Sequence, residues 1–270
     1  MCPGGLDRGH NGRVGRDLAS LLACADAAST LPRLGGMARP DGVVIVSERH
    51  WAFAGRDGSL REGVMPSPPA WLHGLPLARG LARLGLSLAP LFRRRGVAGR
   101  REKPLLLVAL LAPFLLVLLP SGLRLPIGLG ATLALAAWML RGRTLRLHGA
   151  EHRAIAAVEE RRLVSTWDGN AQPSRFSPRC GTNFAALALP ATWLADRFWP
   201  LAPELWTPVA VTAVALAATM EVWRFVQARQ LRVLLVPGLA LQRLTTREPS
   251  LEDTRIALRA AAAVLARELS

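Results

Sequence analysis

The sequence predicts a mainly α-helical, polytopic membrane protein with about four transmembrane helices in two hairpins and a small N-terminal β-meander. Three observations support this fold class. The 270-residue chain has a positive mean hydropathy of +0.25. It contains long stretches without a charged residue, and a short β-branched segment precedes them. Positive hydropathy together with uncharged stretches is typical of chains whose helices lie in a bilayer.

The chain begins with a Gly-rich segment, residues 1–36, that carries charges throughout. It lacks the apolar centre of a secretory signal, so we expect a poorly ordered extension with one short helix near residues 17–28. A small β-rich cytoplasmic region should follow over residues 37–74. Its β-branched run Val43–Val46 favours a strand, and Gly55–Gly58 supplies hairpin-type turn chemistry. The three scattered cysteines imply no disulfide framework.

Residues 75–270 are expected to form a helical membrane domain. Leucines at three- and four-residue spacing predict an amphipathic helix over 75–92. A basic cluster overlaps it, because residues 79–103 contain seven Arg and one Lys against one Glu. We interpret this cluster as a juxtamembrane segment that contacts the anionic headgroups of a lipid bilayer. A solvated linker is the alternative.

The two apolar hairpins provide the predicted spans, near residues 104–121, 125–140, 184–200 and 205–223. The uncharged stretches of the first hairpin each span roughly 24–30 Å at about 1.5 Å per residue, which is just enough for a hydrocarbon core. The second hairpin is less pure, because its first uncharged stretch, 184–195, is short and Asp196 and Arg197 follow it. A buried helical hairpin of a soluble protein is the alternative for the first pair, and a shallow re-entrant pair for the second. Ser250 and Asp253 form a capping-box pattern that should open a C-terminal cytoplasmic helix over 250–268.

The distribution of arginine predicts the orientation of these spans. Basic residues precede the first span and follow the second and fourth, whereas the loops at 121–124 and 200–204 contain one Arg between them. Under the positive-inside rule, both termini and the large polar segments face the cytoplasm. The net charge of +15 does not indicate a nucleic-acid partner, because no recognition motif accompanies the Arg clusters. The oligomeric state is left open.

His148, Glu151 and His152 form the pattern that points to chemistry. On a helix they share one face, so two imidazoles and a carboxylate can meet at one point. Imidazole nitrogens bind divalent metals, zinc first and manganese or iron as alternatives, and Glu151 can act as the general base. The order H-x-x-E-H also occurs in zinc peptidases. The alternative is a helix whose two histidines are only hydrogen-bonded.

Cys180 lies in a Pro/Gly turn before the third span and is a candidate third ligand, although a lone cysteine is more often a small buried apolar residue. Neighbouring Arg179 would lower the thiol pKa if the two side chains approach. Glu221 and Arg224 are a further functional candidate, since they form an i, i+3 pair at the end of the fourth span. An interfacial salt bridge is the alternative for this pair.

Three stretches resemble the YqhQ-like family of bacterial membrane proteins, which are often labelled as predicted metal-dependent enzymes. They are residues 148–153, 174–184 and 237–249. The resemblance extends from about residue 35 to the C-terminus and implies the bacterial cytoplasmic membrane as location. It implies that His148, Glu151, His152 and Cys180 are functional, and Arg247 lies in its third stretch. The chain departs from the family at Ser177, where a histidine is usual, and in its shortened Gly-rich front, of which Gly35–Met37 remains.

Taken together, these features predict an integral membrane protein with a cytoplasm-facing His/Glu/Cys metal site. We expect it to be a metal-dependent, hydrolase-like enzyme of unknown substrate. Under this reading His148, His152 and Cys180 hold the metal and Glu151 is the base. The alternative is a non-enzymatic membrane transporter or scaffold protein. In that case the two histidines would be buried and hydrogen-bonded without sharing a site.

Overall fold

The chain forms two compact units in the computed structural model. The structure describes residues 11–92 and 142–270 apart from 202, 203, 205 and 230, with short pieces between 96 and 134. The sheet unit comprises residues 1–66, 141–180 and 239–270, and the helical unit comprises 67–140 and 181–238. This division differs from the expected single helical domain over residues 75–270. Two segments of that range, residues 141–180 and 239–270, belong to the same unit as the N-terminal region.

The sheet unit contains a four-stranded antiparallel meander in the order β1-β2-β3-β4. Its strands are β1 (Gly35–Arg39), β2 (Gly42–Val46), β3 (His50–Gly55) and β4 (Leu60–Val64). It lies where the β-branched run and the turn residues predict strands. Alternate residues of β2 and β3, including Val43, Ile45, Ala52 and Ala54, turn one face of the sheet toward a helical layer and are fully buried.

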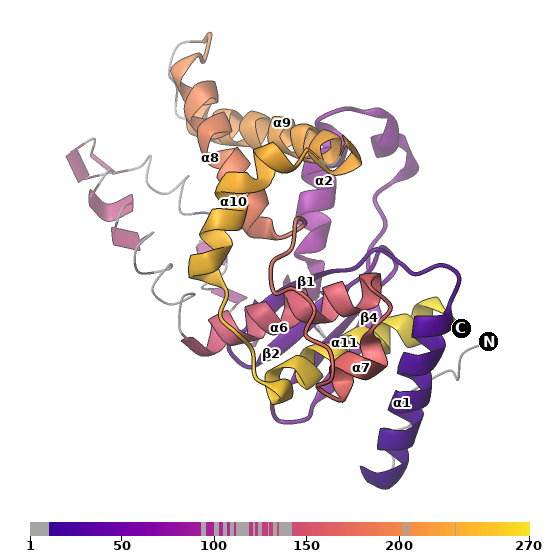
Figure 1. Cartoon of the computed structure of the whole chain (residues 1–270). Helices are drawn as coiled ribbons and strands as arrows, with labels where there is room; N and C mark the ends of the chain where they lie inside the picture. The colour runs from indigo at the N-terminus through magenta and orange to yellow at the C-terminus, as the bar shows by residue number, and fades with distance from the viewer. Residues whose placement is uncertain are drawn as a thin grey trace. The chain divides into compact units, whose positions relative to one another are not determined.

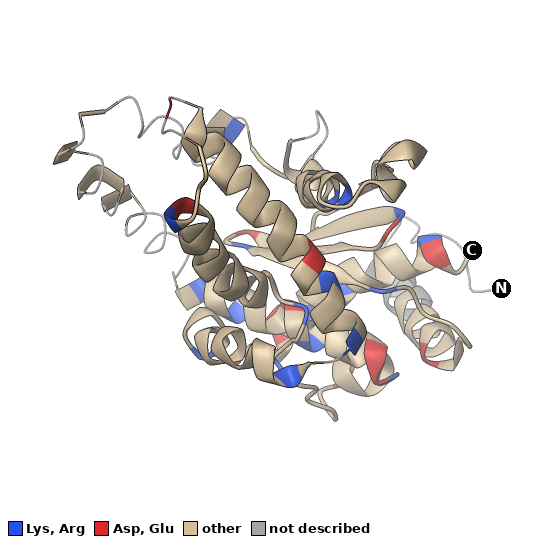
Figure 2. Cartoon of the chain, turned by 90° about the horizontal axis from the view of Figure 1, so that it is seen from above, with Lys and Arg blue, Asp and Glu red and all other residues tan. Residues whose placement is uncertain are grey.

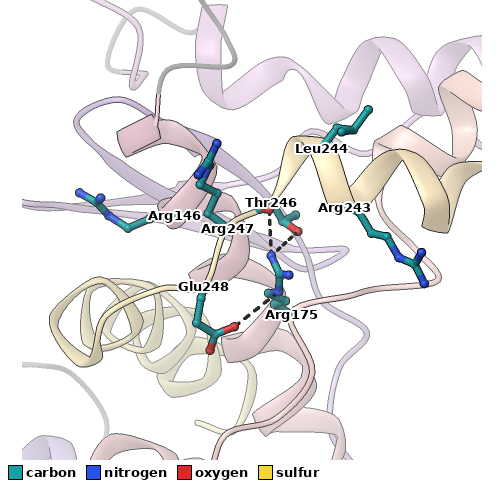
Figure 3. A pocket seen from close by; sticks show the side chains of 7 residues that line it. All are labelled: Arg146, Arg175, Arg243, Leu244, Thr246, Arg247 and Glu248. Carbon is teal, nitrogen blue, oxygen red and sulfur yellow. Dashed lines mark hydrogen bonds and ion pairs between the residues drawn. The ribbon is translucent and has the colours of Figure 1, made fainter.

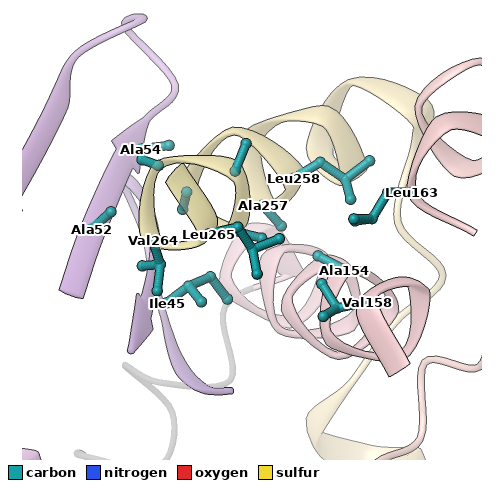
Figure 4. Close-up of a cluster of buried hydrophobic side chains, with 14 of the residues drawn as sticks. Ile45, Ala52, Ala54, Ala154, Val158, Leu163, Ala257, Leu258, Val264 and Leu265 are labelled. Carbon is teal, nitrogen blue, oxygen red and sulfur yellow. The ribbon is translucent and has the colours of Figure 1, made fainter. Parts of the chain in front are cut away.

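The helical layer consists mainly of α6 (Gly142–Glu159) and α11 (Leu251–Glu268). α11 packs on β2 and β3, and α6 packs on β1 and along α11 (Figure 1). Leu258 and Leu265 of α11 fill the centre of the core against the strands and α6 (Figure 4). The predicted capping box is confirmed, because the Ser250 side chain accepts from the Asp253 N–H and the Asp253 carboxylate accepts from the Ser250 N–H.

The structure describes the N-terminal segment from residue 11, and it has a helix where the sequence predicts a short one near residues 17–28. It forms α1 (Asn11–Ala27), whose Leu22 and Ala25 are fully buried in the core. The Asp26 carboxylate accepts hydrogen bonds from the Leu163 and Val164 N–H groups at the start of α7 (Leu163–Trp167). Cys24 is disulfide-bonded, contrary to the prediction from the scattered cysteines.

The helical unit is built around α8 (Gly181–Arg197) and α9 (Thr207–Arg229), which pack along each other. The predicted helix over 75–92 is present as α2 (Ala78–Ser87) and the single turn α3 (Ala89–Phe92), after a 3-10 turn at Ala70–Gly74. α2 packs against α9. α10 (Arg232–Thr245) leaves this unit and continues into the sheet unit.

The prediction of about four transmembrane helices is wrong. Among the described residues, only α9 is long and apolar enough to cross a membrane, with 23 residues and a mean hydropathy of 1.6. Its charged residues, Glu221, Arg224 and Arg229, all lie in its C-terminal half. Figure 2 shows the distribution of charged residues over the described chain. α8 has 17 residues and includes Pro190. At about 1.5 Å per residue it is shorter than a hydrocarbon core of roughly 30 Å. The spans predicted near 104–121 and 125–140 lie largely outside the described residues.

Candidate metal centre

One turn of α6 carries both histidines of the predicted pattern. His148 and His152 are four residues apart, and their ring centroids lie 4.5 Å from each other at an interplanar angle of 64°. His152 is almost fully buried, with 1% of its surface exposed, and His148 is half-buried. Because i and i+4 residues lie on the same helical face, the two imidazoles reach one point, as the sequence predicts.

Backbone carbonyls fix the orientation of both rings. Nδ1 of His148 donates to the Thr245 carbonyl oxygen at 2.8 Å, and Nδ1 of His152 donates to the Arg175 carbonyl oxygen at 2.7 Å. A carbonyl can only accept, so each Nδ1 carries the proton and each Nε2 keeps a lone pair. Metal-binding histidines are held in the same way, by an outer partner on the second ring nitrogen.

Cys180 completes a cluster of three donor atoms. Its Sγ lies 3.4 Å from Nε2 of His148. The donor atoms of His148, His152 and Cys180 all lie within 4.8 Å of one another, so they fit within about 2.8 Å (4.8 Å divided by √3) of a common point. Nε2 of His152 is buried and has no hydrogen-bond partner in the part of the chain that the structure describes. Buried polar atoms are rarely left unpaired, so this nitrogen is a candidate ligand atom.

The donor set fits zinc. Two neutral imidazoles and a thiolate are ligands that zinc prefers, whereas manganese favours oxygen ligands. Typical zinc–nitrogen and zinc–sulfur distances are about 2.0–2.3 Å. The three donor atoms would therefore have to move only slightly closer to their common point to bind zinc. Three protein donors leave one position of a tetrahedral ion open, which is the arrangement of catalytic rather than structural zinc sites.

Glu151 lies on the same turn of α6 as the two histidines but is not one of the three donors. Its side chain is buried against β1, where a Cβ atom on Gly36 would lie 2.8 Å from the Glu151 Oε1. Burial raises the pKa of Glu151 to about 7, although the electrostatic effect of the neighbouring His148 ring and a hydrogen bond from the Ala38 backbone act in the opposite direction. The glycine at position 36 therefore makes room for a carboxyl group that exchanges its proton near neutral pH.

Gln242 holds the loop that carries Cys180, and the sequence analysis did not single it out. Its Oε1 accepts from the Ser177 N–H at 2.9 Å, and its Nε2 donates to the Ser177 carbonyl at 2.8 Å. Ser177 thus contacts Gln242 through its backbone. Its hydroxyl accepts from the Arg179 N–H at 3.2 Å. Gln242 is fully buried. The signal for it in the sequence was a polar glutamine within the largely apolar stretch that forms α10.

The segment after α10 approaches α6 closely at Gly149. A Cβ atom at this position would lie 2.2 Å from the Arg247 carbonyl oxygen. The Arg247 N–H donates to the Leu145 carbonyl at 2.9 Å, so the segment is hydrogen-bonded to α6 three residues before His148. The glycine between the two histidines therefore allows the Thr245 carbonyl to reach His148.

The remaining predicted residues lie outside the donor cluster. Arg179 forms an ion pair with Glu159. Glu221 and Arg224 belong to the helical unit, where Glu221 pairs with Arg79 at 2.7 Å and with Arg224 at 3.1 Å. Arg247 lines a pocket of the sheet unit. The structure therefore brings together His148, His152 and Cys180, with Glu151 adjacent.

These features define a two-histidine, one-cysteine site on a helix that covers a β-meander. The chain belongs to the family described as "Protein of unknown function (DUF1385)", which matches residues 102–267. It is similar to the "Uncharacterized protein YqhQ" of Bacillus subtilis (strain 168), with 32% identity over 124 residues. That match covers 43% of this chain and 38% of the relative's length. The resemblance to the YqhQ-like family is thus confirmed. No solved structure matches the chain.

Proposed function

We propose that this protein is a metal-dependent enzyme of the hydrolase type, with zinc bound by Nε2 of His148, Nε2 of His152 and Sγ of Cys180. The observation that carries this proposal is the convergence of the three donor atoms within 4.8 Å around the unpaired Nε2 of His152. When bound through three protein donors, zinc supplies Lewis acidity and lowers the pKa of a water molecule at its open position.

The protein residues divide the remaining work. The Thr245 and Arg175 carbonyls keep both imidazoles in the tautomer that leaves Nε2 free to bind. Glu151 is the general base, because it is adjacent on α6 and its pKa of about 7 suits proton transfer near neutral pH. Its burial against β1 keeps bulk water away from the carboxyl group.

The alternative is a transporter or scaffold without a metal. That reading expects two hydrogen-bonded histidines that share no site. The Nδ1 bonds agree with it, but the three donor atoms within 4.8 Å of one another, with the thiol 3.4 Å from Nε2 of His148, favour the metal. Glu221, which a transport path would use, is paired with Arg79 and Arg224 instead.

We also propose that the helical unit attaches the protein to a membrane. α9 has the length and hydropathy of a span, and only 28% of its apolar window is buried. Trp193 and Phe198, on α8 and just after it, have exposed fractions of 64% and 71%. Exposed aromatic residues are typical of membrane interfaces. The protein should resist extraction of membranes with alkaline carbonate, and recovery in the soluble fraction would contradict attachment.

Elemental analysis of the purified protein tests the metal site. Wild type, loaded with zinc and dialysed, should retain close to one ion per chain. His152→Ala and Cys180→Ser should each lose it. Glu151→Gln and His50→Ala are matched controls and should retain it, since neither residue belongs to the donor cluster. Cobalt in place of zinc should add a thiolate charge-transfer band that Cys180→Ser removes. Retention of zinc by both ligand variants would refute the site.

A second measurement separates binding from catalysis. Zinc-loaded wild type and Glu151→Gln are compared on a panel of ester, amide and phosphoester substrates. Removal of a general base typically lowers rates about 100-fold to 10,000-fold. We expect that loss in Glu151→Gln with unchanged zinc content. Equal rates in the two proteins would remove Glu151 from the mechanism.

A further inference from the structure

A pocket of about 540 Å³ lies in the sheet unit (Figure 3). Its volume is within the range of sites that hold small molecules. Four arginines line it: Arg146 from α6, Arg175 from the loop before Cys180, Arg243 from α10 and Arg247 from the segment that follows α10. One carboxylate, that of Glu248, accompanies them.

The charges of this pocket are only partly balanced. Glu248 is held by Arg175, at 3.4 Å, and by Arg153. Arg146 lies 3.4 Å from the Asp253 carboxylate. Arg243 and Arg247 are exposed, and neither forms an ion pair with a carboxylate among the described residues. Two guanidinium groups at the pocket thus remain available to an anionic ligand.

The walls of the pocket are the same segments that orient the metal ligands. Arg175 donates from Nη1 to the Thr246 carbonyl at 2.9 Å, while its own carbonyl accepts from His152. Thr246 follows Thr245, whose carbonyl accepts from His148. Figure 3 shows Arg175 between Thr246 and Glu248, facing the pocket. The Arg175 residue that lines the pocket thus also orients His152 through its carbonyl, and Thr246 is the sequence neighbour of Thr245, which orients His148.

We infer that this pocket binds the phosphate of a phosphate ester, which makes phosphate esters the substrate class of the proposed metal site. Arginine binds phosphate oxygens through two parallel N–H bonds, so a cluster with unpaired guanidinium groups favours phosphate over a neutral ligand. The pocket is larger than a phosphate ion and has space for part of the esterified group. The inference rests on the proposed function for the reaction, but the binding of phosphate does not require the metal.

The test measures phosphate binding by calorimetry, with inorganic phosphate and glycerol 3-phosphate as probes. Cys180→Ser provides a metal-free background, so a failure of the zinc site does not affect the result. In this background, Arg243→Gln/Arg247→Gln should weaken binding of both probes at least tenfold. Arg56→Gln/Arg143→Gln removes the same charge from exposed positions of the sheet unit outside the pocket, and it should change the affinity less than twofold. Circular dichroism verifies that both double variants are folded.

Vesicles separate the two sources of phosphate. Binding of glycerol 3-phosphate in solution identifies soluble phosphate esters. If phosphatidate vesicles bind in an Arg243/Arg247-dependent manner while glycerol 3-phosphate does not, the phosphate belongs to a lipid headgroup. Equal losses in the two double variants, or no binding of any probe, would overturn the inference. Phosphate binding without zinc binding in wild type would instead reject the proposed function and leave the phosphate site in place.

Discussion

The Sγ atom of Cys180 lies 3.4 Å from Nε2 of His148, although the two residues are 32 positions apart in the sequence. The approach depends on two separate supports. α6 presents the imidazole with its Nδ1 bonded to Thr245, and Gln242 holds the backbone of Ser177, three residues before the cysteine. Residues of α10 and of the segment after it therefore position both partners.

Gln242→Ala should weaken zinc binding without removing a ligand. The substitution removes both hydrogen bonds that the Gln242 side chain makes with the Ser177 backbone, so the loop that carries Cys180 loses this support. We expect affinity to fall about 10- to 100-fold and the free energy of unfolding to fall by about 1–3 kcal/mol. Competition with a chelator and denaturant titration measure the two quantities. Gln172→Ala, at an exposed loop position, is the control; an equal effect there would contradict the assigned role.

Gly149→Ala should destabilise the sheet unit. The added methyl group would lie 2.2 Å from the Arg247 carbonyl oxygen, so α6 and the segment after α10 must separate. The expected cost is about 1–3 kcal/mol or more, with loss of zinc affinity because the Thr245 carbonyl moves away from His148. Gly142→Ala is the matched control on the same helix, because nothing lies within 4 Å of its Cβ position. It should be neutral or stabilise by up to about 1 kcal/mol. Equal unfolding midpoints for both variants would refute the close approach.

Asp26→Ala should show that α1 is an integral part of the fold. The carboxylate accepts from two N–H groups at the start of α7, at 2.9 and 3.1 Å. Loss of such a helix cap typically costs about 1–2 kcal/mol. Thermal unfolding followed by circular dichroism measures the loss. Asp26→Asn keeps an oxygen acceptor and should lose less. A wild-type unfolding curve for Asp26→Ala would mean that α1 is detached in solution.

Glu268 should make stability depend on pH. Burial by itself raises the pKa of this carboxyl, but hydrogen bonds from Ser47, His50 and Arg49 outweigh it, so the pKa lies below its usual value of 4.5. A pKa that is lower in the folded protein gives stability that is present above the unfolded pKa and lost as pH falls through the folded pKa. Wild type should therefore exceed Glu268→Gln by about 1–3 kcal/mol at pH 7.

The difference between wild type and Glu268→Gln should shrink below about pH 4.5 and vanish at lower pH, when Glu268 is protonated. Denaturant titrations at several pH values measure it. Glu48→Gln removes an exposed neighbouring carboxylate and should produce no comparable difference. A gap between wild type and Glu268→Gln that stays constant with pH would show that the carboxylate charge has no part in the effect.

Local patterns predicted the parts of the structure that depend on neighbours in sequence. Two histidines four residues apart share a helical face wherever that helix packs, and Ser250 and Asp253 cap a helix through contacts within one turn. The β-branched run and the Gly-containing turn likewise predicted the antiparallel strands of the meander. These features follow from backbone geometry and from short-range hydrogen bonds.

Hydropathy was a poorer guide, because apolar residues can be buried by protein as well as by lipid. α1 contains enough leucine to enter the core of the sheet unit, despite the charges that suggested disorder. α8 is apolar but too short to span a bilayer. Hydropathy alone does not distinguish these cases, since each depends on the packing of residues far apart in the chain.

The sequence by itself determined the donor types, the shared face of His148 and His152, and the helix that carries them. Tertiary structure alone decided that Cys180 joins them, that Glu151 turns toward β1, and that Arg175 and Arg247 line one pocket. The physical reason is distance along the chain. Spacing on a helix is fixed by its own hydrogen bonds, whereas the meeting of residues 148, 180 and 242 requires the closure of long loops, which only the packed core stabilises.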